Sequence, residues 1–178
     1  QRTQIGYESS HDLQFMSRDG DEGSVTDVSR GPRNILKKLV KAPSGFQNPV
    51  DGFEVDVVYT ARVCGTVDGP SGTTGEAASD VIASTTEAAP LHAVIGAGQI
   101  ELPGLEEAIG TMREGERAEV TVHPRVAYGS QGDATRGVPP NAFLRYDVLL
   151  QRVFEVSYLA GGRIIKKTLV MPAQTGVP

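Results

Sequence analysis

A single short segment of the chain has helical periodicity, and the segments before and after it alternate like β-strands. In this segment apolar residues recur at positions i, i+3, i+4 and i+7, namely Leu105, Ala108, Ile109 and Met112. Pro103 stands near the first helical position, and Glu106 and Glu107 lie in the first turn, where the helix dipole favours acidic side chains. The pattern predicts one short amphipathic helix that ends between Gly110 and Gly115.

Apolar and polar residues alternate over residues 55–63, which predicts a strand with one buried face. The residues expected on that face are Val55, Val57, Tyr59, Ala61 and Val63. Four further segments have strand patterns: 35–40, 91–95, 118–122 and 144–150. Residues 68–89 are small and polar apart from Val81 and Ile82, so we expect a surface excursion interrupted by an edge strand.

Five or six strands with one helix indicate an α+β architecture. An antiparallel sheet is expected to wrap around the helix, which packs on its concave face. The 178 residues suffice for one domain with tails. Residues 1–30 are polar with scattered apolar positions, which predicts an N-terminal tail or linker, and residues 154–178 form a C-terminal extension.

The composition argues against several classes of function. There are 22 acidic and 17 basic side chains, so the formal net charge is -5 and attraction to a nucleic-acid backbone is not indicated. No apolar run reaches the roughly twenty residues of a membrane span, and we expect a protein of the cytoplasm or of a soluble organelle compartment. Cys64 is the only cysteine, which excludes an intrachain disulfide and any multi-cysteine metal site. We expect neither a metal nor a cofactor.

Four short motifs follow one another in the second half of the chain. They are Gly96–Ile109, Met112–Val122, Ala127-Tyr128-Gly129 and Val138-Pro139-Pro140. Together they resemble the FKBP family of peptidyl-prolyl isomerases, the macrolide-binding immunophilins. The resemblance covers residues 31–153. It implies a half-barrel sheet around one helix and an activity on the X-Pro bonds of protein clients.

The resemblance also assigns roles to individual residues. Tyr59, Ile100 and Tyr128 match family positions that bind the ligand, and they are the candidate catalytic residues. Val138 matches an aliphatic wall residue, and Tyr146 stands where the family usually has phenylalanine. From their strand positions alone, Tyr59 and Tyr146 are more typical of a sheet core than of a ligand site.

Four other expected substrate-binding positions depart from the family pattern. Val81 and Ile82 replace an aromatic residue and a carboxylate, Leu91 replaces an aromatic residue, and Leu105 replaces the tryptophan of the pocket floor. Each Phe or Trp would supply roughly 150–250 Å² of rigid surface. We therefore expect a pocket that is apolar but wider, with weakened macrolide affinity and turnover.

The spacing around the site departs from the family pattern as well. One extra residue lies between Gly96 and Gly104, so either Glu101 or Leu102 should bulge. The loop that follows Tyr128 is one residue longer than the commonest form. Both changes affect the mouth of the expected site.

The two ends resemble those of plant-type immunophilins with several FKBP domains in tandem. The segment Asn34–Lys38 is similar to the beginning of such a domain, and Gly161–Leu169 repeats this pattern after the last expected strand. Residues 154–178 therefore contain either the first strand of a following FKBP-like domain or an extension that packs on its own domain.

Two kinds of function stay open at this point. One is a weakened peptidyl-prolyl isomerase that acts on proline-containing protein clients. The other is a non-catalytic FKBP-like module that binds a protein partner, or has a structural role in a larger assembly. In the second case residues 68–90 and the tails are the expected contact segments.

Overall fold

The computed structural model describes residues 21–29, 34–66, 81–159 and 164–169. For residues 157–159 and 164–169 only the backbone is described. The elements in chain order are β1 (Val25–Asp27), β2 (Ile35–Lys41), β3 (Glu54–Thr66), β4 (Val81–Ser84), β5 (Leu91–Val94), α1 (Leu105–Gly110), β6 (Arg117–Val122), a 3-10 turn (Pro124–Val126), β7 (Ala142–Leu159) and β8 (Ile164–Leu169). In the described part of the chain, no helix is long and apolar enough to cross a membrane.

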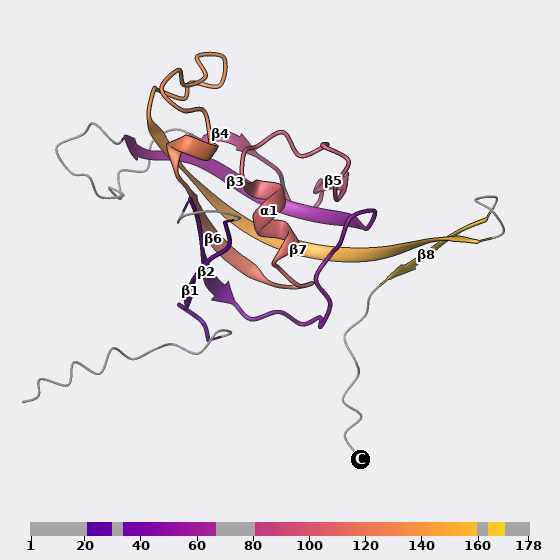
Figure 1. Cartoon of the computed structure of the whole chain (residues 1–178). Coiled ribbons are helices and arrows are strands. Elements are labelled where there is room, and N and C mark those ends of the chain that lie inside the picture. Colours follow the sequence, from indigo (N-terminus) through magenta and orange to yellow (C-terminus); the bar gives the residue numbers. More distant parts are fainter. Residues whose placement is uncertain (1–20, 30–33, 67–80, 160–163, 170–178) are drawn as a thin grey trace, which may run out of the picture.

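The strands form one antiparallel sheet that curves around α1 (Figure 1). Its main order is β1-β2-β6-β7-β3-β4, with β5 paired to β3 and β8 paired to β7. The long strands β3 and β7 pair from Glu54↔Phe154 to Thr66↔Ala142 and form the middle of the sheet. The predicted α+β class is confirmed. Over the described residues the sheet has eight strands rather than five or six. The two additional strands are β1, from the segment predicted as a tail or linker, and β8, from the segment predicted as an extension or the first strand of a following domain.

The core lies between α1 and the concave face of the sheet. All four residues of the helical pattern are 0% exposed, as are the inward residues of β6 and β7, among them Val120, Leu144, Tyr146 and Val148. In β3, Val55, Val57 and Ala61 are also 0% exposed, which confirms the predicted inward face. Tyr59 on the same face is only partly buried. The sheet is therefore incompletely covered near Tyr59.

Gly104 allows the chain to turn into α1 directly against the sheet. Its φ is 72°, in the left-handed region that residues with a Cβ rarely adopt. A Cβ at this position would lie 3.1 Å from Val122 and 3.2 Å from Ile35. The preceding loop is closed by a hydrogen bond of 2.7 Å that the backbone N–H of Gly96 donates to the Glu106 carboxylate. These constraints fix the position of Leu105, the first residue of the helix.

The described parts of both ends pair with the sheet. β1 pairs with β2 through Val25↔Lys38, and Val28 packs against the core. β7 continues to Leu159, beyond the expected domain boundary at residue 153, and pairs with β8 from Phe154↔Leu169 to Leu159↔Ile164. The expected excursion at 68–89 includes the edge strand β4, but its residues 68–80 lie outside the described residues.

Candidate functional site

A cleft of about 230 Å³ opens beside Tyr59, where the sheet is incompletely covered. It is bounded by β3, β4 and β5, by the loop that leads into α1, and by the loop between Tyr128 and Ala142. The residues lining it are Tyr59, Ala83, Leu91, Gln99, Ile100, Glu101, Leu102, Leu105 and Arg136. Most of this wall is aliphatic or aromatic, and the charged groups at the cleft are Glu101 and Arg136.

The structure brings four of the predicted site residues together in this cleft. Tyr59, Ile100, Leu91 and Leu105 all contribute to its wall. Leu105 is 0% exposed and Ile100 is 8% exposed, so each of them also belongs to the core. Their position follows from the strand pattern of β3 and from the loop geometry at Gly104.

Tyr146 lies in the core and supports the cleft without lining it. Its side chain is 0% exposed, and its hydroxyl donates a hydrogen bond of 2.9 Å to the carbonyl oxygen of Pro103. Burial raises the pKa of Tyr146 far above the usual value for tyrosine, so the hydroxyl stays protonated as a donor. Val138, another predicted wall residue, is 3% exposed and belongs to the core. In the structure both residues position the segments around the cleft.

Tyr128 has a buried hydroxyl for which the described residues provide no hydrogen-bond partner. Burial raises its pKa, and the nearby Arg136 guanidinium partly offsets this increase, although the two groups form no hydrogen bond of normal geometry. An unpaired buried hydroxyl costs about 1–3 kcal/mol. A ligand carbonyl that accepted a hydrogen bond from this hydroxyl would recover that cost. For Tyr59, burial is likewise the main cause of a raised pKa, followed by Glu101.

Val81 and Ile82 do not line the cleft, although the family resemblance implied that they would. Val81 is 45% exposed, Ile82 is partly buried against the core, and Ala83 lines the cleft instead. The reason is a register shift between β3 and β4: Ala61 pairs with Ala83, but the next residue of β3 pairs with Val81. Ile82 is thus the extra residue of a bulge, which breaks the simple alternation along this edge strand.

The sequence analysis missed a charged bridge across the mouth of the cleft. Arg136 Nη2 lies 2.7 Å from Glu101 Oε2, and Arg136 Nη1 lies 3.0 Å from Asp133 Oδ2. Asp133 also accepts hydrogen bonds from the backbone N–H groups of Thr135 and Arg136. The bridge links the loop after Tyr128 to the loop before α1. We call Glu101, Asp133 and Arg136 the mouth bridge.

The extra residue before Gly104 was the sequence signal for this bridge. Ile100 and Leu102 are 8% and 6% exposed, whereas the Glu101 side chain is 77% exposed. Glu101 is therefore the residue that turns outward, one of the two possibilities that the spacing left open. With Leu102 buried and the mouth bridge in place, the cleft is smaller and more polar than the sequence suggested. Its volume lies below the roughly 300–1,000 Å³ of pockets for drug-sized ligands.

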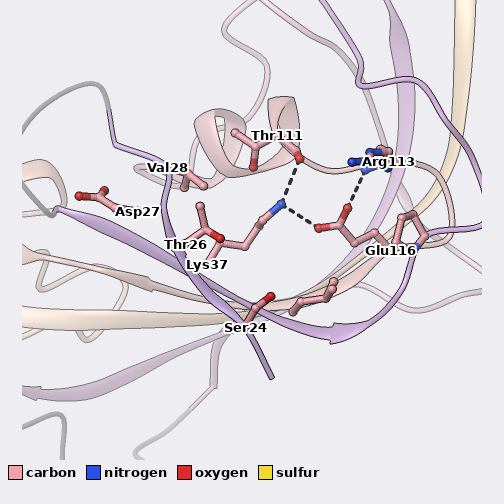
Figure 2. Close-up of a pocket in the computed structure, with 10 residues that line it drawn as sticks. Ser24, Thr26, Asp27, Val28, Lys37, Thr111, Arg113 and Glu116 are labelled. Carbon is pink, nitrogen blue, oxygen red and sulfur yellow. Dashed lines mark hydrogen bonds and ion pairs between the residues drawn. The ribbon is translucent and has the colours of Figure 1, made fainter. Parts of the chain in front are cut away.

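A larger cavity of about 460 Å³ lies elsewhere, between β1, β2 and the segment after α1. Figure 2 shows Lys37 reaching into it, with its ammonium 3.0 Å from the carbonyl oxygen of Thr111 and 2.8 Å from Glu116 Oε1. The other carboxylate oxygen of Glu116 accepts a hydrogen bond from the backbone N–H of Arg113. These groups bind one another and tie β2 to the end of the helix. None of the predicted site residues lines this cavity, so it is not the candidate site.

The charged residues of the described part of the chain include no cluster of three or more His, Cys, Asp or Glu side chains that could hold a metal ion. The nearest approach to such a group is His92, whose two ring nitrogens lie 2.7 Å from Asp56 and 2.9 Å from Glu54. Arg152 also contacts Asp56, at 3.0 Å. This group is a hydrogen-bonded network on β3, β5 and β7, and none of its members lines the cleft.

Comparison with known families gives one match over residues 45–151, to the family described as FKBP-type peptidyl-prolyl cis-trans isomerase. Among curated proteins, FK506-binding protein 59 of Drosophila melanogaster is 29% identical over 127 residues, which are 71% of this chain and 26% of that protein. An FK506-binding protein of Neisseria meningitidis is 36% identical over 66 residues, 37% of this chain and 59% of its own length. The chain thus spans less than two thirds of these relatives.

Solved structures give the same picture. The structure of the three FKBP domains of wheat FKBP73 matches with a TM-score of 0.61 and 29% identity, over 81% of this chain and 54% of that one. The N-terminal domain of FKBP42 from Arabidopsis thaliana matches with a TM-score of 0.58 and 25% identity, over 74% and 93% of the two chains.

Proposed function

Because the chain belongs to the FKBP-type peptidyl-prolyl cis-trans isomerase family, we propose that it accelerates the isomerisation of X-Pro bonds in protein clients, with weakened activity. The observation that supports this most directly is the cleft itself. Tyr59, Ile100 and Leu105 meet there in a wall that is mostly apolar, and the charged residues of that wall, Arg136 and Glu101, lie near the unpaired hydroxyl of Tyr128. The clients would present a proline ring to the cleft and the preceding carbonyl to that hydroxyl.

The chemistry requires no nucleophile and no metal. Rotation about the X-Pro bond passes a barrier of about 18–20 kcal/mol, at which the amide is twisted and has lost its resonance. A site that binds the twisted form better than the planar form lowers this barrier. Here Leu105 and Ile100 would pack against the proline ring, and the Tyr128 hydroxyl would hold the carbonyl in the twisted geometry. Its raised pKa keeps the hydroxyl protonated for this role.

Two features account for the weakened activity in this proposal. The floor of the cleft is Leu105, which offers less rigid surface than an aromatic residue. The carboxylates near the cleft, Glu101 and Asp133, are both engaged by Arg136. A ligand with a planar X-Pro amide is therefore bound less tightly, and the twisted form of the amide gains fewer contacts.

A non-catalytic binding role is the second candidate, and a specific observation favours it. The cleft of about 230 Å³ is crossed at its mouth by the mouth bridge. Such a site can hold a proline ring of a partner protein without providing the extra contacts that favour the twisted amide. The expected partner contacts through residues 68–90 and the tails belong to this alternative.

The two candidates differ in one measurement, the exchange rate between cis and trans forms of a short X-Pro peptide. We would measure it by NMR exchange spectroscopy with the full chain. Catalysed exchange that is lost in Tyr128→Phe combined with Tyr59→Ala supports the isomerase. Phe46→Ala, at a 71% exposed position that does not line the cleft, is the matched control and should keep the rate. A folded protein that leaves the exchange rate unchanged would rule out turnover and favour the binding role.

A further inference from the structure

We propose that the cleft selects X-Pro segments with a carboxylate on a residue next to the proline, and that Arg136 is the residue that recognises this carboxylate. In this proposal Glu101 is an internal occupant that the ligand carboxylate displaces. The inference rests on the proposed function, because it assumes that the same cleft receives the proline. It adds a substrate class, acidic X-Pro segments, to that function.

Arg136 is held in place from one side. Its Nη1 lies 3.0 Å from Asp133, a carboxylate that is only 17% exposed and that also accepts the backbone N–H groups of Thr135 and Arg136. Asp133 is in turn fixed by a two-way backbone bridge to Val138, with both hydrogen bonds at 2.8 Å. The guanidinium therefore has a supported position at the mouth before any ligand arrives.

The partner on the other side of Arg136 is held much more loosely. The Glu101 side chain is 77% exposed and approaches Arg136 through a single oxygen, at 2.7 Å. Exposed pairs of this kind contribute little because water and salt screen them. A carboxylate from a ligand can replace Glu101 at Nη2, and the planar fork of the guanidinium suits a carboxylate in particular.

The surroundings favour an acidic ligand over a basic one. The remaining wall of the cleft is uncharged, so a side chain beside the proline meets Arg136 and Glu101 as the charged groups of the lining. Asp133 already accepts three hydrogen bonds, so its carboxylate oxygens have little remaining capacity to accept a hydrogen bond from a lysine. Glu101 is mostly in water, where a pair with lysine is screened. Arg136 is 36% exposed and is supported, so it is the stronger point of recognition.

The test compares three capped peptides that differ only in the residue before proline, which is Glu, Gln or Lys. Dissociation constants are measured by NMR titration of the full chain at low and at high salt. We expect the Glu peptide to bind about threefold or more tighter than the Lys peptide at low salt, and the difference to shrink at high salt. A second set with the varied residue after proline determines on which side the carboxylate is read. Tighter binding of the Glu peptide than of the Lys peptide in either set supports the proposal.

Two variants separate recognition from a general effect on the cleft. Glu101→Gln removes the internal occupant and should tighten binding of the Glu peptide by about 1.4- to 5-fold, the range of an exposed ion pair. Arg136→Gln should abolish the preference for Glu while leaving binding of the Gln peptide in place. Both side chains are at the surface, so the amide spectrum should stay that of a folded protein.

The possible failures are distinguishable. Equal binding of the Glu, Gln and Lys peptides in both sets overturns the charge selection and leaves the proposed function intact. A preference for Glu that persists in Arg136→Gln overturns the role of Arg136. If no peptide binds to the folded chain, the proposed function fails, and the selection fails with it.

Discussion

The hydrogen bond between Tyr146 and Pro103 gives the sharpest test of how the cleft is built. Tyr146→Phe removes the hydroxyl from a side chain that is 0% exposed and leaves the half-buried carbonyl of Pro103 without this donor. The bond is 2.9 Å long, which is ordinary for a hydroxyl donor. Loss of one partner from such a bond costs about 1–3 kcal/mol, because the remaining group is left desolvated. The ring itself keeps its apolar contacts, so no cavity term is added.

The assay is urea unfolding followed by fluorescence or circular dichroism. With a slope of about 1–3 kcal/mol per molar urea, the midpoint should fall by about 0.3–3 M while the slope stays the same. Tyr59→Phe is the matched control, because this tyrosine is only partly buried. Its free energy of unfolding should stay within about 0.5 kcal/mol of that of the original protein. Equal midpoints for the original protein and Tyr146→Phe would refute the reasoning, since the hydroxyl would then contribute nothing to the fold.

Three further predictions concern stability. Gly104→Ala should lower the free energy of unfolding by about 1–2 kcal/mol for the left-handed backbone, and further because the added Cβ is crowded against the sheet. Gly98→Ala, with a φ of 67° and nothing within 4 Å of the added Cβ, should show the backbone cost alone. Equal losses of stability in the two variants would contradict the effect of this crowding. Glu116→Ala removes the carboxylate partner of the 12% exposed Lys37 ammonium and should cost about 3 kcal/mol in urea unfolding. Arg117→Ala breaks a half-exposed pair and should cost at most about 1 kcal/mol. Finally, burial raises the pKa of each site tyrosine, so the folded state holds protons that the unfolded chain loses above a pH of about 10. Stability should therefore be complete below that pH and fall as the pH rises further; a urea midpoint that rises between pH 9 and pH 11 would contradict this sign.

Most of the fold could be predicted because the periodicity of the core residues is regular. The helical spacing at residues 105–112 and the alternation in β3, β6 and β7 come from residues that are 0% exposed or nearly so. In such elements, burial on one face dictates the pattern, and the pattern can be read without knowing the partners. The short strand β1 carries a weaker signal, since its three residues are exposed or half-exposed. A strand was one of the two expectations for the segment of β8, but its pairing with β7 could not be read from the sequence.

The cleft could be predicted only in part. Tyr59, Leu91, Ile100 and Leu105 were found because each belongs to a regular element or to a recognisable motif. Val81 was misplaced because the bulge at β4 shifts the pairing by one residue after Ala83, and a family pattern counted along the sequence contains no sign of such a shift. The edge of a sheet is where bulges are most frequent, so this kind of error is expected there.

The mouth bridge was missed for a different reason, since its members are far apart in the sequence and none of them follows a pattern. Its origin nevertheless lies in one feature that the sequence did contain, the extra residue before Gly104. With that residue present, Ile100 and Leu102 can both remain in the core only if Glu101 points outward, where Arg136 meets it. The same loop ends at Pro103, whose carbonyl oxygen accepts a hydrogen bond from the Tyr146 hydroxyl. An insertion of one residue therefore accounts for the charge of Glu101 at the mouth. If the loop were shortened by deleting Glu101, the contact with Arg136 should be lost, and Ile100 and Leu102 could no longer both remain in the core.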